Sequence, residues 1–294
     1  MDNRKYLKKS IKKFLRKEVG FGCPVSGCRL PFLEYHHFDP PYSEGKIHNQ
    51  DGMIAFCPTH HNQADQGAWS ISDMHQMKKE KNREPVKGRL EWSIRESILI
   101  AGNNYFMGAP FKFRVKGVEV FGLEQDRKGR LLINSLLWNK KGEVVALINR
   151  NDISVNHLNI GDLNCMASGK KIRVETSDSS NYFEVCFDRI PVEDLIRKVI
   201  DKMKGEEGDV IAKQIGSFKR REKDGTLCLL TFKCRIETEQ VKITIDSSNI
   251  NMDFTGTGTD SANLTDRFFE ENATLSIKGV SNNKSPIELL YLGK

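Results

Sequence analysis

Two patterns of apolar and polar residues divide the 294-residue chain. Near the N-terminus, apolar positions recur at helical spacing over residues 3–18 and again over residues 70–82. From about residue 90 to residue 190, apolar and polar residues alternate in short runs that are separated by glycine-bearing turns such as DRKG and NKKGE. This alternation predicts an antiparallel sheet. The pattern therefore predicts an α+β protein with a helical beginning and a β-rich remainder.

One further helix is predicted within the β-rich region. Residues 191–205 begin with proline, carry two acidic residues in the first turn, show an apolar stripe and end at glycine. Residues 83–88, REPVKG, are interpreted as a linker. The expected organisation is a basic amphipathic helix over 1–19, a Cys/His-rich module over 20–88, a β-rich domain over 89–190, the helix over 191–205, and over 206–294 a second β-rich unit or a continuation of the same domain.

Charge is concentrated at the N-terminus. The chain has a formal net charge of +7, and residues 1–18 hold eight Lys/Arg against two Asp/Glu, a net of +6. Such a helix is expected to lie along a phosphate backbone, or to dock its apolar stripe on the next domain while its lysines face solvent. The predicted nucleic-acid contacts are Lys8, Lys9, Lys12, Lys13 and Arg16.

No run approaches the roughly eighteen apolar residues that a membrane helix requires. The basic N-terminal segment has no apolar core behind its charges, so a signal peptide is not expected. We therefore expect a cytoplasmic protein with no membrane partner. In that compartment the seven cysteines should be reduced, and clustered cysteines should ligate metal rather than form disulfides.

Cysteine and histidine gather in one segment. Six of the seven histidines and three of the seven cysteines lie within residues 23–75. Cys23 and Cys28 form one close pair, and Cys57 and His60 form a second pair after 28 intervening residues. This spacing is typical of a tetrahedral structural zinc site, in which one ion joins two segments that lack a sufficient core. The alternative is four buried side chains without metal.

A second group of ligand-type residues lies beside the first. His61 and Asp65 are four residues apart, so on a helix they share one face. His36 and His37 are adjacent in an extended stretch, so their side chains point in opposite directions. One of these two histidines can then ligate a second metal beside His61, while the other faces a substrate.

The segments CPVSGC, EYHHFDPP and CPTHHNQAD together resemble the HNH endonucleases, that is, the ββα-metal nucleases, in their zinc-containing form. The resemblance covers about residues 20–70. It implies that His36 and His61 are ligands of a catalytic metal, that Asp65 is a third ligand, and that His37 is the general base. It also places Cys57 and His60 on the zinc pair of the family.

The resemblance further implies an activity and a cofactor. The expected reaction is hydrolysis of DNA, with RNA as an alternative substrate, in which a neutral histidine accepts a proton from the attacking water. A divalent cation would stabilise the leaving 3′ oxygen. Mg²⁺ is the expected catalytic ion, and Mn²⁺ and Ni²⁺ are alternatives.

One departure from the family pattern leaves alternatives open. The family normally has an asparagine five residues before the cysteine that begins the helix, and this position is Gly52 here. Asn49 or Asp51 could substitute for it. One alternative is a zinc-containing nucleic-acid-binding module with a decayed active site. Another is a nuclease whose β-rich region senses a regulatory ligand or protein partner. His48 is interpreted as a solvated loop residue, with contact to a phosphate as the alternative.

Overall fold

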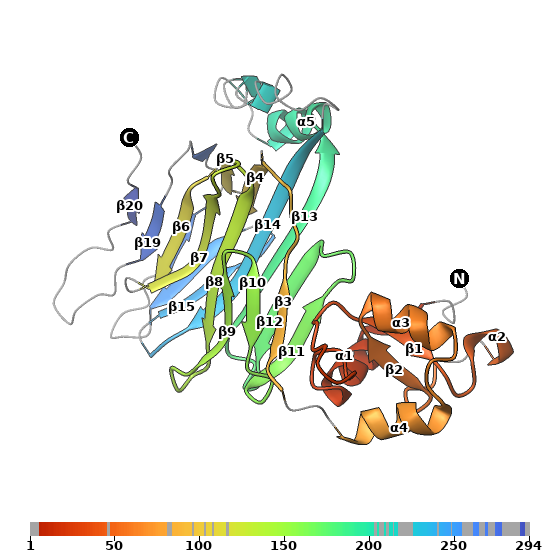
Figure 1. Cartoon of the computed structure of the whole chain (residues 1–294). Coiled ribbons are helices and arrows are strands. Elements are labelled where there is room, and N and C mark those ends of the chain that lie inside the picture. Colours follow the sequence, from red (N-terminus) through yellow and green to blue (C-terminus); the bar gives the residue numbers. More distant parts are fainter. Residues whose placement is uncertain are drawn as a thin grey trace.

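The structure is a computed structural model of the chain. It describes residues 6–45, 48–80, 84–95, 97–102, 104–107, 109–115, 118–202, 205, 209, 212–213, 215–216, 226–239, 241–247, 249–254, 261–264, 268–269, 274–277 and 289–291. The described residues form a mixed helical and β structure in which β-sheet predominates, which confirms the α+β class (Figure 1). None of the helices described is long and apolar enough to cross a membrane.

The N-terminal part of the chain is a small helical unit around a two-stranded sheet. Its elements are α1 (Lys9–Glu18), β1 (Glu34–His37), α2 (Tyr42–Gly45), β2 (Met53–Phe56), α3 (Pro58–Asp65) and α4 (Ile71–Glu80). β1 and β2 are antiparallel, with His36 opposite Ile54. All four residues of β2 are buried, and they pack against Leu15 and Val19 of the α1 segment in a separate hydrophobic core.

α1 is shorter than the sequence predicts. It begins at Lys9 rather than at residue 3, residues 6–8 are not helical, and residues 1–5 lie outside the described part. It ends because Gly20 adopts a left-handed conformation with φ of 66°, which glycine tolerates best. The Phe21 amide then donates to the Arg16 carbonyl at 2.7 Å. This turn directs the chain toward the first cysteine pair.

α4 begins at a reciprocal cap. The Ser70 hydroxyl accepts from the Asp73 amide at 3.1 Å, and the Ser70 amide donates to the Asp73 carboxylate at 2.9 Å. Met74 is buried but Ile71 is 50% exposed, so the apolar positions at helical spacing over 70–82 do not all face inward. The helix lies below β2 in the view of Figure 1.

The rest of the described chain forms two large sheets. In spatial order, the eight-stranded sheet contains β20 (Leu289–Tyr291), β19 (Thr274–Ile277), β6 (Phe111–Val115), β7 (Val118–Gln125), β8 (Leu131–Trp138), β9 (Val144–Asn149), β10 (Asp152–Val155) and β3 (Val86–Arg89). The ten-stranded sheet contains β11 (Ile160–Cys165), β12 (Lys171–Thr176), β13 (Tyr182–Pro191), β14 (Thr226–Glu237), β15 (Val241–Ile245), β16 (Ile250–Phe254) and β17 (Ser261–Leu264), with β4 (Ser97–Ala101), β5 (Asn104–Met107) and β18 (Phe268–Phe269) joined through β14.

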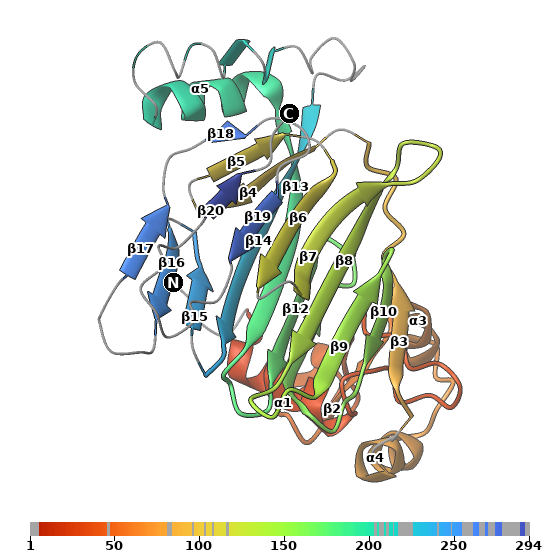
Figure 2. The same ribbon diagram turned by 90° about the vertical axis from the view of Figure 1, so that its left-hand side faces the viewer.

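The two sheets pack face to face as a sandwich. Side chains from both sheets form a single buried cluster, in which Phe121 of β7 stacks on Phe232 of β14 with ring centroids 4.1 Å apart. Alternate residues of β14 are buried, as the polar–apolar alternation of the sequence requires. The views in Figures 1 and 2 show the long strands β13 and β14 running behind β6, β7 and β8.

Three strand pairs differ from the predicted antiparallel arrangement. β4 runs parallel to β14, β6 parallel to β19, and β5 parallel to β18. In each pair the partners are far apart in the sequence, so no turn motif indicates the pairing. The predicted linker over 83–88 is also wrong in part, because β3 begins at Val86 and pairs with β10.

The chain that follows the helix predicted over 191–205 adds strands to both sheets. α5 (Val192–Lys202) packs Leu195 and Val199 against Leu227 at one end of the sandwich, and residues 203–204 of the predicted helix lie outside the described part. β14 pairs with β13 in the ten-stranded sheet, and β19 pairs with β6 in the eight-stranded sheet. Much of the predicted 206–294 segment is not described.

A buried ion pair joins the N-terminal unit to the sandwich. The Arg16 guanidinium donates from Nε and Nη2 to the Asp162 carboxylate at 2.9 and 2.6 Å, and from Nη1 to the Tyr35 hydroxyl at 2.7 Å. Arg16 is only 4% exposed. The backbone of Phe32 also bridges to Cys165 of β11. α1 is therefore fixed against the outer face of the ten-stranded sheet.

Candidate metal centres and active site

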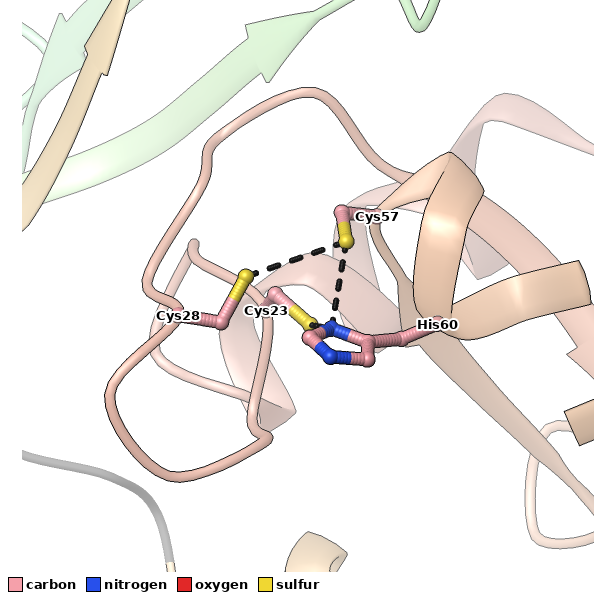
Figure 3. Close-up of side chains that lie close together, drawn as sticks. All are labelled: Cys23, Cys28, Cys57 and His60. Carbon is pink, nitrogen blue, oxygen red and sulfur yellow. Dashed lines mark hydrogen bonds between the residues drawn. The ribbon is translucent and has the colours of Figure 1, made fainter. Parts of the chain in front are cut away.

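Three cysteines and one histidine converge where the first cysteine turn meets the start of α3. Cys57 is the residue before α3, and Pro58 in the first helical position directs the first turn so that His60 faces back toward the cysteines. The Cys28 and Cys57 sulfurs are 3.7 Å apart, and His60 Nδ1 lies 3.2 Å from both Cys23 Sγ and Cys57 Sγ. Figure 3 shows the four side chains pointing toward one another.

The spacing of these atoms fits a tetrahedral ion. Bonds of about 2.3 Å to sulfur separate two thiolate ligands of a tetrahedral zinc by about 3.8 Å, close to the 3.7 Å between Cys28 and Cys57. A disulfide would need about 2.05 Å. All four ligand atoms lie within 4.8 Å of one another. The cluster could therefore hold a metal such as zinc, which would offset the burial that raises the pKa of Cys23.

A residue that the sequence did not single out supports this cluster. The Arg29 guanidinium is buried and donates to the backbone carbonyls of Val19, Gly20 and Gly22 at 3.1, 2.7 and 3.0 Å. It also donates to the Glu84 carbonyl at 3.1 Å. Arg29 therefore holds the loop that precedes Cys23. An arginine whose partners are all backbone carbonyls has no signature in the sequence.

The second predicted metal group also comes together. His36 of β1 places Nδ1 3.0 Å from Asp65 Oδ1, and His61 of α3 places Nδ1 3.2 Å from Asp65 Oδ2. The ligand atoms of the three residues lie within 4.8 Å of one another. Glu34, two residues before His36 on β1, places Oε2 3.8 Å from His61 Nδ1. One strand and one helix thus present two imidazoles and a carboxylate to a single point.

His37 lies in the same cleft as this group. The cleft has a volume of about 720 Å³. Its lining includes His36, His37, His48, His61, Asp65, Tyr42, Lys12 and Tyr6. The His36 ring packs edge-on against His61 with centroids 5.3 Å apart, whereas the His37 ring packs 5.0 Å from Tyr42. The two adjacent histidines therefore contact different neighbours within one cavity.

Burial favours the neutral form of both histidines of β1. It lowers the pKa of His36 and also the pKa of His37, and the nearby His48 imidazole lowers the pKa of His37 further. A neutral imidazole is the form that ligates metal and the form that accepts a proton. Both histidines are therefore chemically suited to the roles that the sequence predicts for them.

The basic residues of the N-terminal segment are arranged differently from one another. Lys8 and Lys9 are exposed, and Lys12 lines the cleft with Nζ 5.8 Å from the Tyr35 ring. Lys13 lies 3.8 Å from the Glu175 carboxylate of the sandwich. Arg16 is buried against Asp162, so its predicted contact with nucleic acid is wrong. The sequence does not indicate that Arg16 lies on the buried face of α1, because nothing in it distinguishes a buried arginine from an exposed one.

The structure explains why glycine occupies position 52. A Cβ added there would overlap the Asp39 carbonyl oxygen, and it would lie 3.2 Å from the Asp39 Cα. The Gly52 carbonyl accepts from the Phe38 amide at 2.9 Å and from the Asp39 amide at 3.1 Å. Position 52 is therefore a close approach between the two halves of the hairpin, and a larger residue does not fit.

Another side chain fixes the loop before β2. Lys78 of α4 donates from Nζ to the carbonyls of Gln50, Asp51 and Met53 at 2.7, 2.9 and 2.7 Å. The Asn49 side chain accepts from the Asp51 amide at 3.2 Å and so closes its own turn. The sequence does not indicate this role of Lys78, since a lysine beside other lysines on a helix is normally solvated.

His48 is not the solvated loop residue that the sequence predicts. It is partly buried, and its Nδ1 lies 3.0 Å from His37 Nε2. Its ring stacks on Tyr42 with an interplanar angle of 19°. His75, in contrast, is partly exposed, and its Nε2 lies 3.7 Å from the Asp39 carboxylate.

Comparisons of the chain with protein-family models, with curated proteins and with solved structures gave no match.

Proposed function

We propose that the chain is a metal-dependent endonuclease of the HNH type that hydrolyses phosphodiester bonds in DNA. The observation that carries the proposal is the convergence of His36, His61 and Asp65 in one cleft that also contains His37. Imidazoles are suitable ligands for first-row transition-metal ions, and the carboxylate is also a suitable ligand for Mg²⁺ and Mn²⁺. A spare neutral imidazole beside such a group has the properties of a general base.

The two clusters have different roles in this proposal. The four-ligand cluster of Cys23, Cys28, Cys57 and His60 is a closed set of sulfur and nitrogen donors, as in structural zinc sites. It holds the start of α3 against the first cysteine turn. The adjacent His61 is then directed into the cleft, because it is the next residue on the same helix.

The side chains in the cleft divide the work of hydrolysis. A divalent cation bound by His36, His61 and Asp65 would supply positive charge to the phosphate and the leaving 3′ oxygen. His37 would accept the proton of the attacking water, and the burial that lowers its pKa favours the unprotonated form that this role requires. Lys12, which lines the same cleft, attracts a phosphate of the substrate. Lys8 and Lys9 extend the positive surface along α1.

The decayed-site alternative rested on Gly52. That residue is required by the close approach to Asp39, so its presence has a structural cause that is independent of activity. The set of His36, His37, His61 and Asp65 is complete, which favours an active enzyme over a binding module that has lost its chemistry.

A specific contact favours regulation by the sandwich as a further part of the function. Asp162 of β11 binds Arg16, and Arg16 binds Tyr35, the residue directly before His36 on β1. A ligand or protein partner that displaces β11 would therefore act on the strand that carries the proposed base. Low basal cleavage that rises on addition of such a factor would support this role.

A cleavage assay tests the proposed function. Supercoiled DNA, linear DNA and RNA would each be incubated with the full zinc-loaded chain in Mg²⁺, Mn²⁺ or Ni²⁺. We expect DNA cleavage by the wild type and its loss, by at least about 100-fold, in His37→Ala. His75→Ala is the matched control, because this partly exposed histidine does not line the cleft. Equal cleavage by His37→Ala and wild type would refute the assignment of His37 as the general base. Cleavage of RNA but not of DNA would show that the substrate is RNA.

A further inference from the structure

We propose that His48 is the positioning residue of the proposed base His37, and that it fixes both the orientation and the tautomer of that imidazole. The inference rests on the proposed nuclease function and extends it to a residue outside the family pattern. Its basis is one contact: His48 Nδ1 lies 3.0 Å from His37 Nε2. The two ring centroids are 5.2 Å apart, and Tyr42 packs on both rings.

Only one hydrogen can lie between these two nitrogens when both imidazoles are neutral. If His37 carries the hydrogen on Nε2 and donates it to His48, then His37 Nδ1 has a free lone pair and can accept a proton. If His48 donates instead, the hydrogen of His37 lies on Nδ1, and neither of its nitrogens is free. His37 is therefore a base only while His48 Nδ1 acts as the acceptor.

The other ring nitrogen of His48 also affects which of the two histidines donates the shared hydrogen. The residue at position 48 therefore influences the tautomer of His37. His48 Nε2 is buried and has no hydrogen-bond partner within the described part of the chain. When His48 Nδ1 accepts from His37, the hydrogen of His48 lies on this nitrogen. An acceptor that does not need to hold a second hydrogen, such as an amide oxygen, would favour the active tautomer of His37 at least as well as histidine does.

The loop that carries His48 is fixed from two sides. Lys78 binds three backbone carbonyls between residues 50 and 53, and the Gly52 carbonyl binds the amides of Phe38 and Asp39. Phe38 directly follows His37, so the loop and the strand are tied to each other next to the histidine pair. These contacts hold the loop without an asparagine at position 52, and they leave His48 to contact the base.

A purely structural role for His48 is distinguishable from this one. His48 is not part of the hydrophobic core of the N-terminal unit. Its contacts are with His37 and Tyr42 on the wall of the cleft. Removing the imidazole should therefore change catalysis at saturating substrate while the fold and the zinc content remain.

The test compares His48→Leu with His48→Asn in the full zinc-loaded chain. Asparagine places an amide oxygen near the position of the histidine Nδ1, whereas leucine has no acceptor. In steady-state cleavage of a DNA duplex in Mg²⁺, we expect His48→Leu to lower kcat by about 10- to 100-fold with KM changed less than about threefold. His48→Asn should recover kcat to within about threefold of wild type. Equal losses in both variants, unchanged kcat in His48→Leu, or an effect confined to KM would each overturn the inference.

A second readout does not depend on activity. Nitrogen-15 NMR spectra of the histidine rings report which nitrogen of a neutral imidazole carries the hydrogen. We expect His37 to carry it on Nε2 in the wild type and in His48→Asn, and to lose this preference in His48→Leu. A hydrogen on Nδ1 in the wild type would refute the positioning role. If the wild type has the Nε2 tautomer but cleaves no nucleic acid, then the nuclease function fails and the histidine contact stands.

Discussion

Replacing Gly52 with alanine should destabilise the N-terminal unit, even though alanine adds a single methyl group. The added Cβ would overlap the Asp39 carbonyl oxygen, which belongs to the backbone and cannot rotate away. The segment that follows β1 and the loop before β2 must therefore separate. That movement weakens the two hydrogen bonds from Phe38 and Asp39 to the Gly52 carbonyl.

The magnitude follows from these contacts. Each weakened hydrogen bond costs about 0.5–1.5 kcal/mol, and overpacking at a buried position costs about 1–3 kcal/mol. We therefore expect Gly52→Ala to lower the free energy of unfolding by about 2–6 kcal/mol. Urea-induced unfolding, followed by circular dichroism, measures this change.

Gly67→Ala is the matched control. Gly67 has φ of +79°, and no atom lies within 4 Å of a Cβ added there, so its substitution tests backbone strain without a steric clash. That strain is expected to cost about 1–2 kcal/mol. A Gly52→Ala variant as stable as Gly67→Ala would refute the close-approach explanation. Gly52→Asn, which introduces the asparagine of the HNH pattern, should not increase cleavage; an increase would support the decayed-site alternative.

Other substitutions test separate parts of the molecule. Cys57→Ser should release zinc and lower the thermal midpoint, as measured by elemental analysis and calorimetry, whereas Cys186→Ser on the sandwich should retain zinc. Arg16→Met leaves the Asp162 carboxylate buried and unpaired, so the unfolding free energy in urea should fall by about 3–5 kcal/mol and largely recover when Asp162→Leu is added; no recovery would contradict a simple ion pair. Lys9→Gln should reduce the salt-dependence slope of DNA binding by about 0.9, measured by fluorescence anisotropy, and an unchanged slope would show no phosphate contact.

The sequence predicted which cysteine, histidine and aspartate side chains come together, because their geometry is local. Cys57 directly precedes α3, and His60, His61 and Asp65 lie on this one short helix, so the spacing alone determines which of them share a face. His36 and His37 occupy consecutive strand positions, and β1 is paired to the strand that leads directly into that helix. Short segments with regular geometry are therefore enough to bring the two clusters together.

The sequence did not predict features that depend on distant parts of the chain. Arg16 meets Asp162 across 146 positions, and β4 pairs in parallel with β14 across a similar separation. Neither contact leaves a local motif. His48 and Lys78 act through a loop whose path is set by the close approach at Gly52, and a glycine in a polar loop does not indicate what lies against it.

The most direct test of the central claim is crystallography of the zinc-loaded chain soaked in Mn²⁺, with anomalous diffraction recorded at the zinc and manganese edges. We expect a zinc peak among Cys23, Cys28, Cys57 and His60, and a separate manganese peak among His36, His61 and Asp65. A zinc peak without any ion between His36 and His61 would contradict the claim, because the cleft would then contain a base without the cation that the proposed reaction requires.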